Sequence, residues 1–579
     1  MNLRNALNAR VAAALEQCDV AGAPLLRTAS RPEFGDYQAN GIMAAAKRAR
    51  RNPRELAEIV CDALLTLDAQ AQPPLLEKAE VAGPGFINLH LRPDWLAAQV
   101  QDAPLLSPVT DTQRVVVDYS SPNLAKEMHV GNLRSTIIGD ALARMLEAVG
   151  HRVIRQNHVG DWGTQFGMLI TELEQQQNAS DQAIELHDLE AFYQQAKRHF
   201  DADEDFARRS REAVVALQQG DDYMRTLWQQ FVDLSLAHGQ SQYDRLGVSL
   251  GPDDVMPESA YNARLPGIVE HLRTENLLTE SDGAQCVFLE EFSNKKGDPL
   301  PVIVQKTGGG YLYATTDLAA CEYRSETLEA DRVLYLVDVR QSLHFKQVFA
   351  VARKAGLVRD AVSFEHLPFG TMLGKDGKPF KTRTGGVVKL SDLLDEAQSR
   401  AAALLAQRSQ DDDTALSETE RAAASAIIGI GAVKYSDLSK NRTSDYVFDW
   451  DQMIAFEGDT APYLQYAYTR VRSLFRRAGE TFGAMTGPCT ISEPAERSLA
   501  LTLLQFQEVL ENATAEGFPH YLTGYLYELA TRYSQFYEQC PVLKADGPTR
   551  ASRLLLCQRT GQTLARGLEL LGIGTIERM

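Results

Sequence analysis

The segment Val115–Leu146, VVVDYSSPNLAKEMHVGNLRSTIIGDALARML, decides the fold of this chain. It begins as an apolar strand, continues as a loop of Ser, Pro and Asn, and enters a helix at His129. Apolar residues recur at helical spacing as far as Val149, and Gly150 is placed to end the helix. Because a helix N-terminus carries partial positive charge and unpaired N–H groups, this unit predicts a phosphate-binding site.

Two residues at the start of this helix suit a nucleotide. His129 is a hydrogen-bond donor for phosphate oxygens, and Gly131 has no side chain that would keep a nucleotide at a distance. Taken alone, the tetrapeptide His129–Asn132 is equally consistent with a histidine that caps a helix beside a glycine turn. Its position between a strand and a helix favours the nucleotide site.

Length and composition restrict the class of protein. A chain of 579 residues is expected to form about three or four domains. No apolar run reaches membrane-spanning length, and the N-terminus has no signal-like apolar core. Seven cysteines without a Cys-x-x-Cys pair argue against a zinc knuckle or a disulfide framework, and favour the cytoplasm. Much of the net charge of −18 lies in Glu172–Asp254, so nearly neutral ends leave RNA binding open.

The pattern of expected elements divides the chain. Residues 1–110 predict a small α+β module that closes with the strand GFINLHL. In 111–390, VVVDYS, HRVIRQNHV, VIVQK, YLYATTDLA and RVLYLVDV alternate with helical patterns, which predicts a Rossmann-like α/β domain with a parallel sheet. A polar helical stretch at about 172–260 interrupts it as an insertion. Residues 391–454 predict a connecting helical region and 455–579 an all-α domain, with no convincing strand after about 416.

A basic cluster lies on or beside the second helix of the first module. It consists of Lys47, Arg48, Arg50, Arg51 and Arg54. A solvated helix face is the simpler interpretation, and a phosphate-contacting patch is the alternative.

Longer motifs identify a family. The string SSPNLAKEMHVGNLRSTIIGDALARMLEAVGH, followed by NHVGDWGTQFGMLI, resembles the arginyl-tRNA synthetases of class I. The resemblance continues in the family's order through YLYATTDLAA, VDVRQSLHFKQVF, TAPYLQYAYTRVRSL and the terminal Met579. It implies activation of L-arginine by ATP to arginyl-adenylate, and transfer to the 2′-OH of the terminal adenosine of tRNA(Arg). It further implies Mg²⁺ on the pyrophosphate, a cytoplasmic monomer, and adenylate formation that requires bound tRNA.

Two signatures depart from the class I pattern. Asn132 stands where the HIGH motif has its second His; its amide still donates a hydrogen bond but carries no charge. The KMSKS motif corresponds to MLGKDGKPFKTRTGG, in which Lys375, Lys378, Lys381 and Arg383 are candidate phosphate ligands. A basic surface loop without catalytic function is the alternative for this segment.

The resemblance implies a nucleotide site built from three parts of the chain. His344 and Gln347 lie one helical turn apart after the strand YLVDV, where a doubly wound sheet places its ligands, although a helix surface pair is the alternative. The expected ATP-binding residues are Lys126, His129, Gly131, Asn132, His344 and Gln347. The expected catalytic residues are His129, Asn132, Lys375, Lys378 and Lys381.

An arginine pocket needs a carboxylate, because a guanidinium is a planar fork of donors. Asp118 ends the first strand, and Tyr313 and Asp317 share one face if a helix starts there. The resemblance assigns these residues to the pocket together with Asn123, for the α-amino or carboxylate end, and Gln341. Helix capping is the alternative for each Asp.

Both ends of the chain are expected to contact tRNA. Phe86 and Asn88 share a strand face, where the aromatic ring would stack on an unpaired base and the amide would read its edge. The resemblance suggests a base in the D-loop of the tRNA. A simple core position is the alternative for Phe86. Near the C-terminus, Tyr463, Tyr466 and Arg470 recur at helical spacing. Such a stripe is usually core, but the resemblance matches it and Met579 to anticodon contacts.

One signature and two competing functions remain open. The family signature NHVGDWGTQ contains His158, Gly160, Asp161, Trp162 and Gln165, which either support the site or contact the acceptor end. A nucleotidylyltransferase shares the helix start but is usually a short, single-domain protein. A non-catalytic tRNA-binding paralogue would have no need of an arginine pocket. Another class I specificity, such as cysteine or methionine, lacks the zinc-ligand cysteines.

Overall fold

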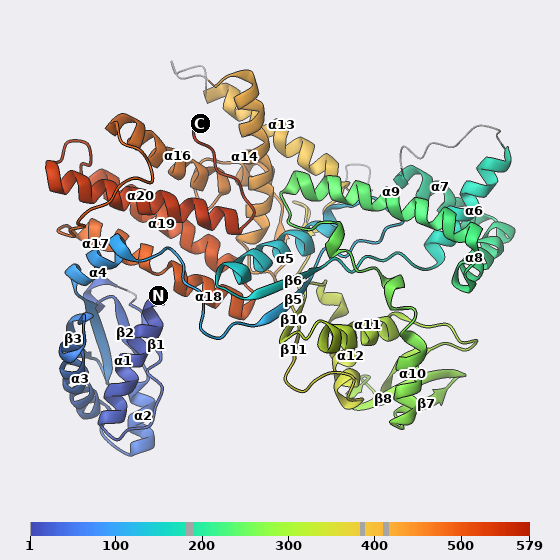
Figure 1. Cartoon of the computed structure of the whole chain (residues 1–579), viewed down its shortest axis with the longest axis horizontal. Coiled ribbons are helices and arrows are strands. Elements are labelled where there is room, and N and C mark those ends of the chain that lie inside the picture. The colour runs from blue at the N-terminus through green and yellow to red at the C-terminus, as the bar shows by residue number, and fades with distance from the viewer. Residues whose placement is uncertain (1, 30, 180–188, 382–387, 409–415) are drawn as a thin grey trace.

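Four short parallel strands, in the order β11-β10-β5-β6, form the centre of the molecule (Figure 1). They are β5 (Arg114–Asp118), β6 (Arg152–Gln156), β10 (Arg332–Tyr335) and β11 (Ser363–His366). The computed structural model describes residues 2–29, 31–179, 189–381, 388–408 and 416–579. Val115 and Val117 pack into one core cluster and Val116 into another, so both faces of β5 are buried. This arrangement confirms the Rossmann-like α/β class.

The predicted strand–loop–helix unit is present. β5 leads through residues 119–129 into α5 (Val130–Ala148). Gly150 has a φ of 102°, and the His151 amide donates to the Leu146 carbonyl at 3.0 Å. Because this left-handed backbone favours glycine, Gly150 ends the helix as predicted.

Two segments expected among the parallel strands lie elsewhere. The stretch VIVQK belongs to a separate antiparallel sheet of β7 (Leu278–Ser281), β8 (Ala284–Ser293) and β9 (Pro299–Gln305). Val302 and Val304 are buried, whereas Ile303 between them is 38% exposed. A strand with one wet face suits an antiparallel sheet, so placing it in the parallel sheet was wrong. The stretch YLYATTDLA is largely helical, as α11 (Tyr313–Glu322), which runs into a π-helical turn, η4 (Tyr323–Thr327).

Two further helices complete the half of the domain that follows the insertion. They are α10 (Leu265–Thr274) and α12 (Ser342–Lys354), which pack with α11 on the face of the sheet that buries Val116. A two-stranded parallel pair, β12 (Met372–Leu373) with β13 (Tyr446–Val447), ties this part to the C-terminal region. The expectation of no strand after about 416 was therefore wrong at β13.

The N-terminal module is an antiparallel sheet with helices on one face. Its elements are α1 (Leu3–Gln17), β1 (Leu26–Thr28), β2 (Tyr37–Ala39), α2 (Ile42–Ala49), α3 (Pro53–Gln70), β3 (Leu76–Ala82), β4 (Phe86–Leu91) and α4 (Pro93–Asp102). The strand order is β1-β2-β4-β3. Alternating apolar residues of β4, Ile87, Leu89 and Leu91, are buried with the helices. The opposite face of the sheet is therefore polar.

A helical insertion projects from the central domain beside the parallel sheet (Figure 1). It contains α6 (Thr164–Ala179), α7 (Leu189–Ala202), α8 (Glu204–Gln219) and α9 (Asp222–Leu246). The helices pack around aromatic residues such as Phe192 and Phe231, whose rings lie 5.8 Å apart. No described helix is both long enough and apolar enough to cross a membrane.

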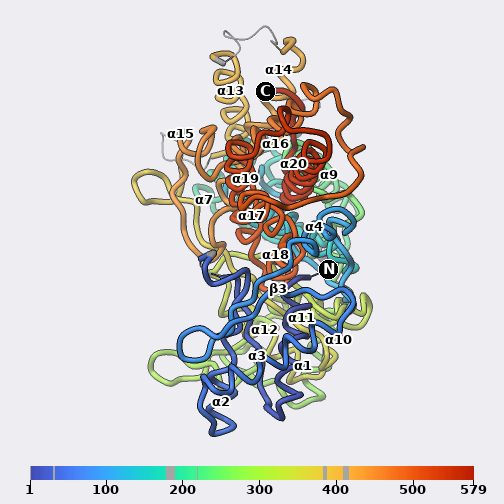
Figure 2. Tube along the Cα trace, turned by 90° about the vertical axis from the view of Figure 1, so that its left-hand side faces the viewer, coloured from blue at the N-terminus to red at the C-terminus, as the bar shows by residue number. Residues whose placement is uncertain are grey.

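The C-terminal third of the chain is a bundle of helices. They are α13 (Leu390–Arg408), α14 (Glu418–Leu438), α15 (Trp450–Met453), α16 (Ala461–Ala478), α17 (Pro494–Leu504), α18 (Phe506–Glu516), α19 (His520–Gln539) and α20 (Gly547–Leu570). The turned view in Figure 2 shows this bundle above the N-terminal module. The two are joined by hydrogen bonds, such as that from the Tyr37 hydroxyl to Glu508 Oε2 at 2.9 Å.

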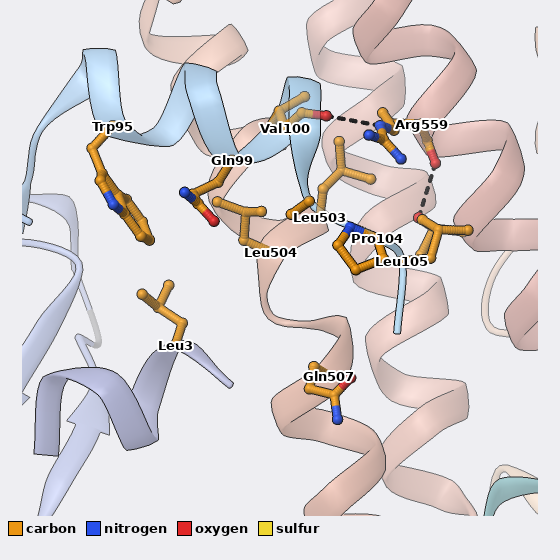
Figure 3. A pocket seen from close by; sticks show the side chains of 12 residues that line it. Leu3, Trp95, Gln99, Val100, Pro104, Leu105, Leu503, Leu504, Gln507 and Arg559 are labelled. Atoms are coloured by element: carbon orange, nitrogen blue, oxygen red, sulfur yellow. Dashed lines mark hydrogen bonds between the residues drawn. The ribbon is translucent and has the colours of Figure 1, made fainter. Parts of the chain in front are cut away.

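A small pocket marks the junction between the N-terminal module and the bundle (Figure 3). Leu3 and Trp95 line it from the module, and Leu503 and Leu504 line it from α17. Arg559 of α20 donates to the carbonyls at the end of α4, at 2.7 Å to each of Val100 and Gln101. A guanidinium at a helix C-terminus satisfies its free carbonyls, so this pocket belongs to the packing of the junction.

Candidate active site

A pocket opens at the carboxyl end of the parallel sheet, where doubly wound folds bind their ligands. It encloses about 900 Å³, including its open mouth. All five residues expected to bind arginine line this pocket, together with His344: Asp118, Asn123, Tyr313, Asp317 and Gln341. They come from β5, the loop after it, α11 and the start of α12, so the fold gathers residues more than 200 positions apart.

Asp118 is already paired within the protein. Its Oδ2 lies 2.8 Å from the guanidinium of Arg324, and its Oδ1 accepts from the Ser121 hydroxyl at 2.9 Å. Arg324 is fully buried, stacks over the Tyr335 ring at 4.7 Å and donates to Gln156 at 2.6 Å. Its position in the π-helical turn brings it to this place. Arg324 therefore compensates the charge of Asp118, and the pocket holds two further carboxylates.

Asp317 is one such carboxylate. α11 begins at Tyr313, so Tyr313 and Asp317 lie one turn apart on the same face, as predicted. Asp317 Oδ2 lies 2.6 Å from His344 Nε2, which links α11 to α12. Tyr313 is 66% exposed at the rim of the pocket. Helix capping does not explain Asp317, because it lies inside the helix.

Glu258 is the second carboxylate, and it is not among the residues predicted from the sequence. Glu258 lines the pocket, and burial raises its pKa to about 7, with the charges of Asp317 and Asp161 acting in the same direction. It lies in a short 3-10 turn between the insertion and α10, where no periodic pattern marks it. Crowded carboxylates of this kind would be stabilised by a cation between them.

The signature NHVGDWG supports this turn. Asp161 is buried and accepts the amide of Ser259 at 2.9 Å, which fixes the backbone beside Glu258. The carbonyl of Asp161 accepts from the Trp228 indole at 2.7 Å, so the signature also holds the insertion in place. Its His158 lines the pocket. Structural support therefore accounts for Asp161, whereas His158 faces the ligand space.

The helix start carries a reciprocal cap. His129 Nδ1 accepts from the Gly131 amide at 3.0 Å, and Asn132 Oδ1 accepts from the His129 amide at 3.0 Å. Because Nδ1 accepts, a neutral ring carries its proton on Nε2. Burial lowers the pKa of His129, and the nearby Lys126 cation acts in the same direction. His129 thus presents a neutral N–H donor, and Asn132 keeps its amide nitrogen as a donor.

Two residues that follow the lysine-rich segment contact this helix start. The Val388 carbonyl accepts from the Val130 amide at 3.1 Å, and Lys389 pairs with Glu127 at 3.1 Å. Lys375 lies 3.2 Å from Asp449. Lys378 and Lys381 are exposed on the described part of the segment, and Arg383 lies outside the described residues.

The remaining expected nucleotide residues are not all gathered in the pocket. Gly131 is exposed at the helix start, and a Cβ there would lie 2.7 Å from the His129 ring. Lys126 Nζ lies 4.6 Å above the Tyr193 ring of α7. Gln347 lies one turn beyond His344 on α12 and is not among the residues that line this pocket.

The two expected RNA surfaces differ in exposure. Phe86 is half-buried on the polar face of the N-terminal sheet, but Asn88 is only 3% exposed, and its Oδ1 accepts from Gln38 at 2.8 Å. The Asn88 side chain therefore presents little surface to a base in this conformation. The basic cluster of residues 47–54 is exposed at the end of α2 and the start of α3.

The C-terminal surface lies on α16 and α19. Tyr463 packs against the Tyr527 ring at 5.7 Å, and Arg470 lies 4.2 Å from the Tyr537 ring. Tyr466, between them on α16, is 42% exposed. Met579 is half-buried against the bundle. This aromatic stripe is thus partly core and partly surface.

Family models match nearly the whole chain. The model described as "tRNA synthetases class I (R), catalytic domain" matches residues 96–450. The "DALR anticodon binding domain" matches residues 464–579, and the "Arginyl tRNA synthetase N terminal domain" matches residues 2–91.

Curated relatives and solved structures agree with these models. Proteins named arginine–tRNA ligase from Haemophilus influenzae (strain PittEE) and Laribacter hongkongensis (strain HLHK9) are 54% and 56% identical over 591 and 585 residues, covering 100% of each chain. The arginyl-tRNA synthetase structures of Plasmodium falciparum and Thermus thermophilus have TM-scores of 0.85 and 0.83 at 28% and 26% identity. They cover 99% and 100% of both chains. The chain therefore belongs to the arginyl-tRNA synthetase family of class I.

Proposed function

We propose that the chain is an arginine–tRNA ligase, which activates L-arginine with ATP and transfers it to tRNA(Arg). The observation that carries this proposal is a pocket at the sheet edge that gathers Asp317 and Glu258 beside Asp118 and Asn123, the end of the strand and the loop that lead into the capped start of α5. A guanidinium is the side-chain group that two carboxylates and an aromatic rim hold best.

In the arginine half, Asp317 and Glu258 bind the guanidinium while Tyr313 covers it. Asn123 and Gln341 bind the α-amino and carboxylate end. Asp118 lines the same pocket and remains a proposed arginine contact, with its carboxylate held in place by Arg324. His344 orients Asp317 through their 2.6 Å contact.

In the nucleotide half, ATP binds with its phosphates at the start of α5. The arginine carboxylate attacks the α-phosphate, the bond to pyrophosphate breaks, and the pyrophosphate leaves. Nε2 of His129 and the amide of Asn132 donate to the phosphate oxygens, and Lys378 and Lys381 neutralise the charge on the leaving group. Lys126, Gly131, Lys375, His344 and Gln347 remain proposed members of this site. Positioning supplies most of the catalysis.

In the second step the terminal 2′-OH of tRNA attacks the activated carbonyl, and AMP leaves. We propose that the N-terminal domain (1–110) contacts the D-loop through Phe86 and Asn88. The α-helical domain (455–579) contacts the anticodon through Tyr463, Tyr466, Arg470 and Met579. The catalytic domain spans 111–390 with its insertion at about 172–260. Residues 391–454 connect it to the α-helical domain.

Mg²⁺, a monomeric state and a cytoplasmic location complete the proposal. Mg²⁺ usually keeps waters and substrate phosphates as ligands, so it enters with ATP. Within the described ranges, no group of three or more His, Cys, Asp and Glu side chains is placed to hold a metal ion.

Arginine-dependent exchange of pyrophosphate into ATP tests the first step. We expect exchange with L-arginine only, and only when tRNA(Arg) is present. Exchange that proceeds equally well without tRNA would contradict the tRNA requirement, and exchange with another amino acid would contradict the pocket.

A further inference from the structure

One charged side chain outside the proposed site is fully buried at the junction of four segments. Lys434 of α14 has no exposed surface, and its Nζ donates to the carbonyls of Leu246 and Gly572 at 2.7 Å each. Burial lowers the pKa of Lys434 to about 8, an effect that the Asp140 charge opposes. A buried ammonium is costly unless it is hydrogen-bonded and close to an opposite charge, so the two carbonyls and Asp140 hold Lys434 in this one place.

The same junction contacts α5, the helix at whose start ATP is proposed to bind. Asp140, in the middle of α5, is fully buried and accepts from Arg144 Nε and the Ser249 amide, both at 2.8 Å. Arg144 also donates to the Gly247 carbonyl at 2.8 Å. The turn after α9, residues 246–249, is therefore bound to α5 on one side and to Lys434 on the other.

One arm from this junction reaches the proposed arginine site. Tyr243 lies one turn before Leu246 on α9, and its hydroxyl is 2.8 Å from the Ser120 hydroxyl and accepts from the Asn157 amide at 3.1 Å. Ser120 belongs to the loop between β5 and α5, next to Ser121, which contacts Asp118. A shift at Leu246 would therefore move a hydrogen-bonded wall of the pocket.

The other arm reaches the α16 surface. Gly572 begins the C-terminal tail, residues 572–579. Its φ of 65° favours glycine, and a Cβ on it would lie 2.4 Å from Lys434 Nζ, so the absence of a side chain suits this close approach. The tail packs along α16. The carbonyl of Gly574 accepts from Gln465 at 2.8 Å, and the carbonyl of Ile576 accepts from Thr469 at 2.9 Å. In Figures 1 and 2 the C-terminus lies beside α14 and α16.

We propose that Lys434 is a positioning residue that couples the C-terminal tail, and through it the proposed anticodon surface on α16, to the α5 helix and the arginine pocket. This inference rests on the proposed function. RNA contact at α16 and Met579 displaces the tail. Because Lys434 bonds both Gly572 of the tail and Leu246 of α9, it transmits this displacement to α9. Two carbonyl acceptors from separate segments on one amine make this link direct.

The test compares two RNAs. Arginylation is measured with a tRNA(Arg) transcript and with a transcript whose anticodon is altered. The proteins are the full-length parent, Lys434→Met and Lys440→Met. The last is the control, because it makes the same change at an exposed lysine just beyond α14. We expect Lys434→Met to lower kcat about tenfold with tRNA(Arg) and to leave the rate with the altered tRNA unchanged. The affinity for L-arginine, measured without tRNA, should change less than about twofold. Lys440→Met should match the parent.

If Lys434→Met slows arginylation of both RNAs equally, its role is merely structural and the proposal is overturned. An unchanged rate with tRNA(Arg) would also overturn it. Because Lys434→Met risks misfolding, Thr469→Val provides a second series: it removes one tail hydrogen bond while nearly conserving volume. It should give a smaller loss with the same preference for tRNA(Arg), and equal losses on both RNAs would contradict the coupling. A parent that arginylates neither RNA would instead contradict the proposed function.

Discussion

Arginine affinity should depend on the ionisation of Glu258. A guanidinium binds the ionised carboxylate, and the pKa of Glu258 is raised to about 7, so at lower pH the free enzyme must first lose a proton. Between pH 8 and pH 6 the ionised fraction falls about tenfold, and the Kd for L-arginine should rise by about the same factor.

Glu258→Gln separates this effect from other titrations. The amide keeps the size of the side chain but removes the charge, and we expect arginine to bind about 2 kcal/mol more weakly at pH 8, since hydrogen bonds to charged groups contribute about that much. The pH dependence should flatten in this variant. Calorimetric titration of L-arginine at pH 6, 7 and 8 measures both quantities.

Two results would refute the reasoning. A parent Kd that stays constant from pH 6 to 8 would mean that Glu258 does not titrate in this range or does not meet the substrate. A Glu258→Gln variant with the same steep dependence would assign the titration to another group. An exposed carboxylate, Glu275→Gln, serves as the control and should match the parent.

The other predictions concern the helix start, the lysines and the pocket wall. Asn132→His should change the rate of pyrophosphate exchange more than the Kd for arginine, and a larger change in arginine affinity would contradict the division of the site. Asn132→Ala should also remove half of the capping box, lowering the free energy of unfolding by about 1 kcal/mol in urea titrations. Lys378→Ala and Lys381→Ala should each slow exchange at least about tenfold without weakening arginine binding, and unchanged rates would leave these lysines as surface residues. Arg324→Met should destabilise the fold by about 3 to 5 kcal/mol because it leaves Asp118 buried and unpaired, and a loss below about 1 kcal/mol would contradict that pairing.

Local patterns predicted the parts of the site that lie close in sequence. The apolar strand, the Ser-Pro-Asn loop and Gly150 defined β5 and α5, and the four-residue spacing of Tyr313 and Asp317 placed them on one helix face. These features follow from periodicity and helix-end chemistry, which act over a few residues.

Long-range pairings were not predictable in this way. Arg324 and Asp118 are 206 residues apart in the sequence, and Lys434 and Leu246 are 188 apart. No local sequence pattern therefore predicts either contact. Glu258 enters the pocket from a turn after the insertion. β9 resembled a parallel strand because its apolar run did not reveal that one face is wet. Asn88 shares a face with Phe86 as expected, but Gln38 from a neighbouring strand occupies its amide oxygen.

Charging of total tRNA with each of the twenty amino acids, radiolabelled one at a time, tests the central claim most directly. The account predicts that only L-arginine labels the RNA, that labelling requires ATP, and that Glu258→Gln needs much more arginine to reach the same rate. Labelling by a different amino acid, or by none, would contradict the account.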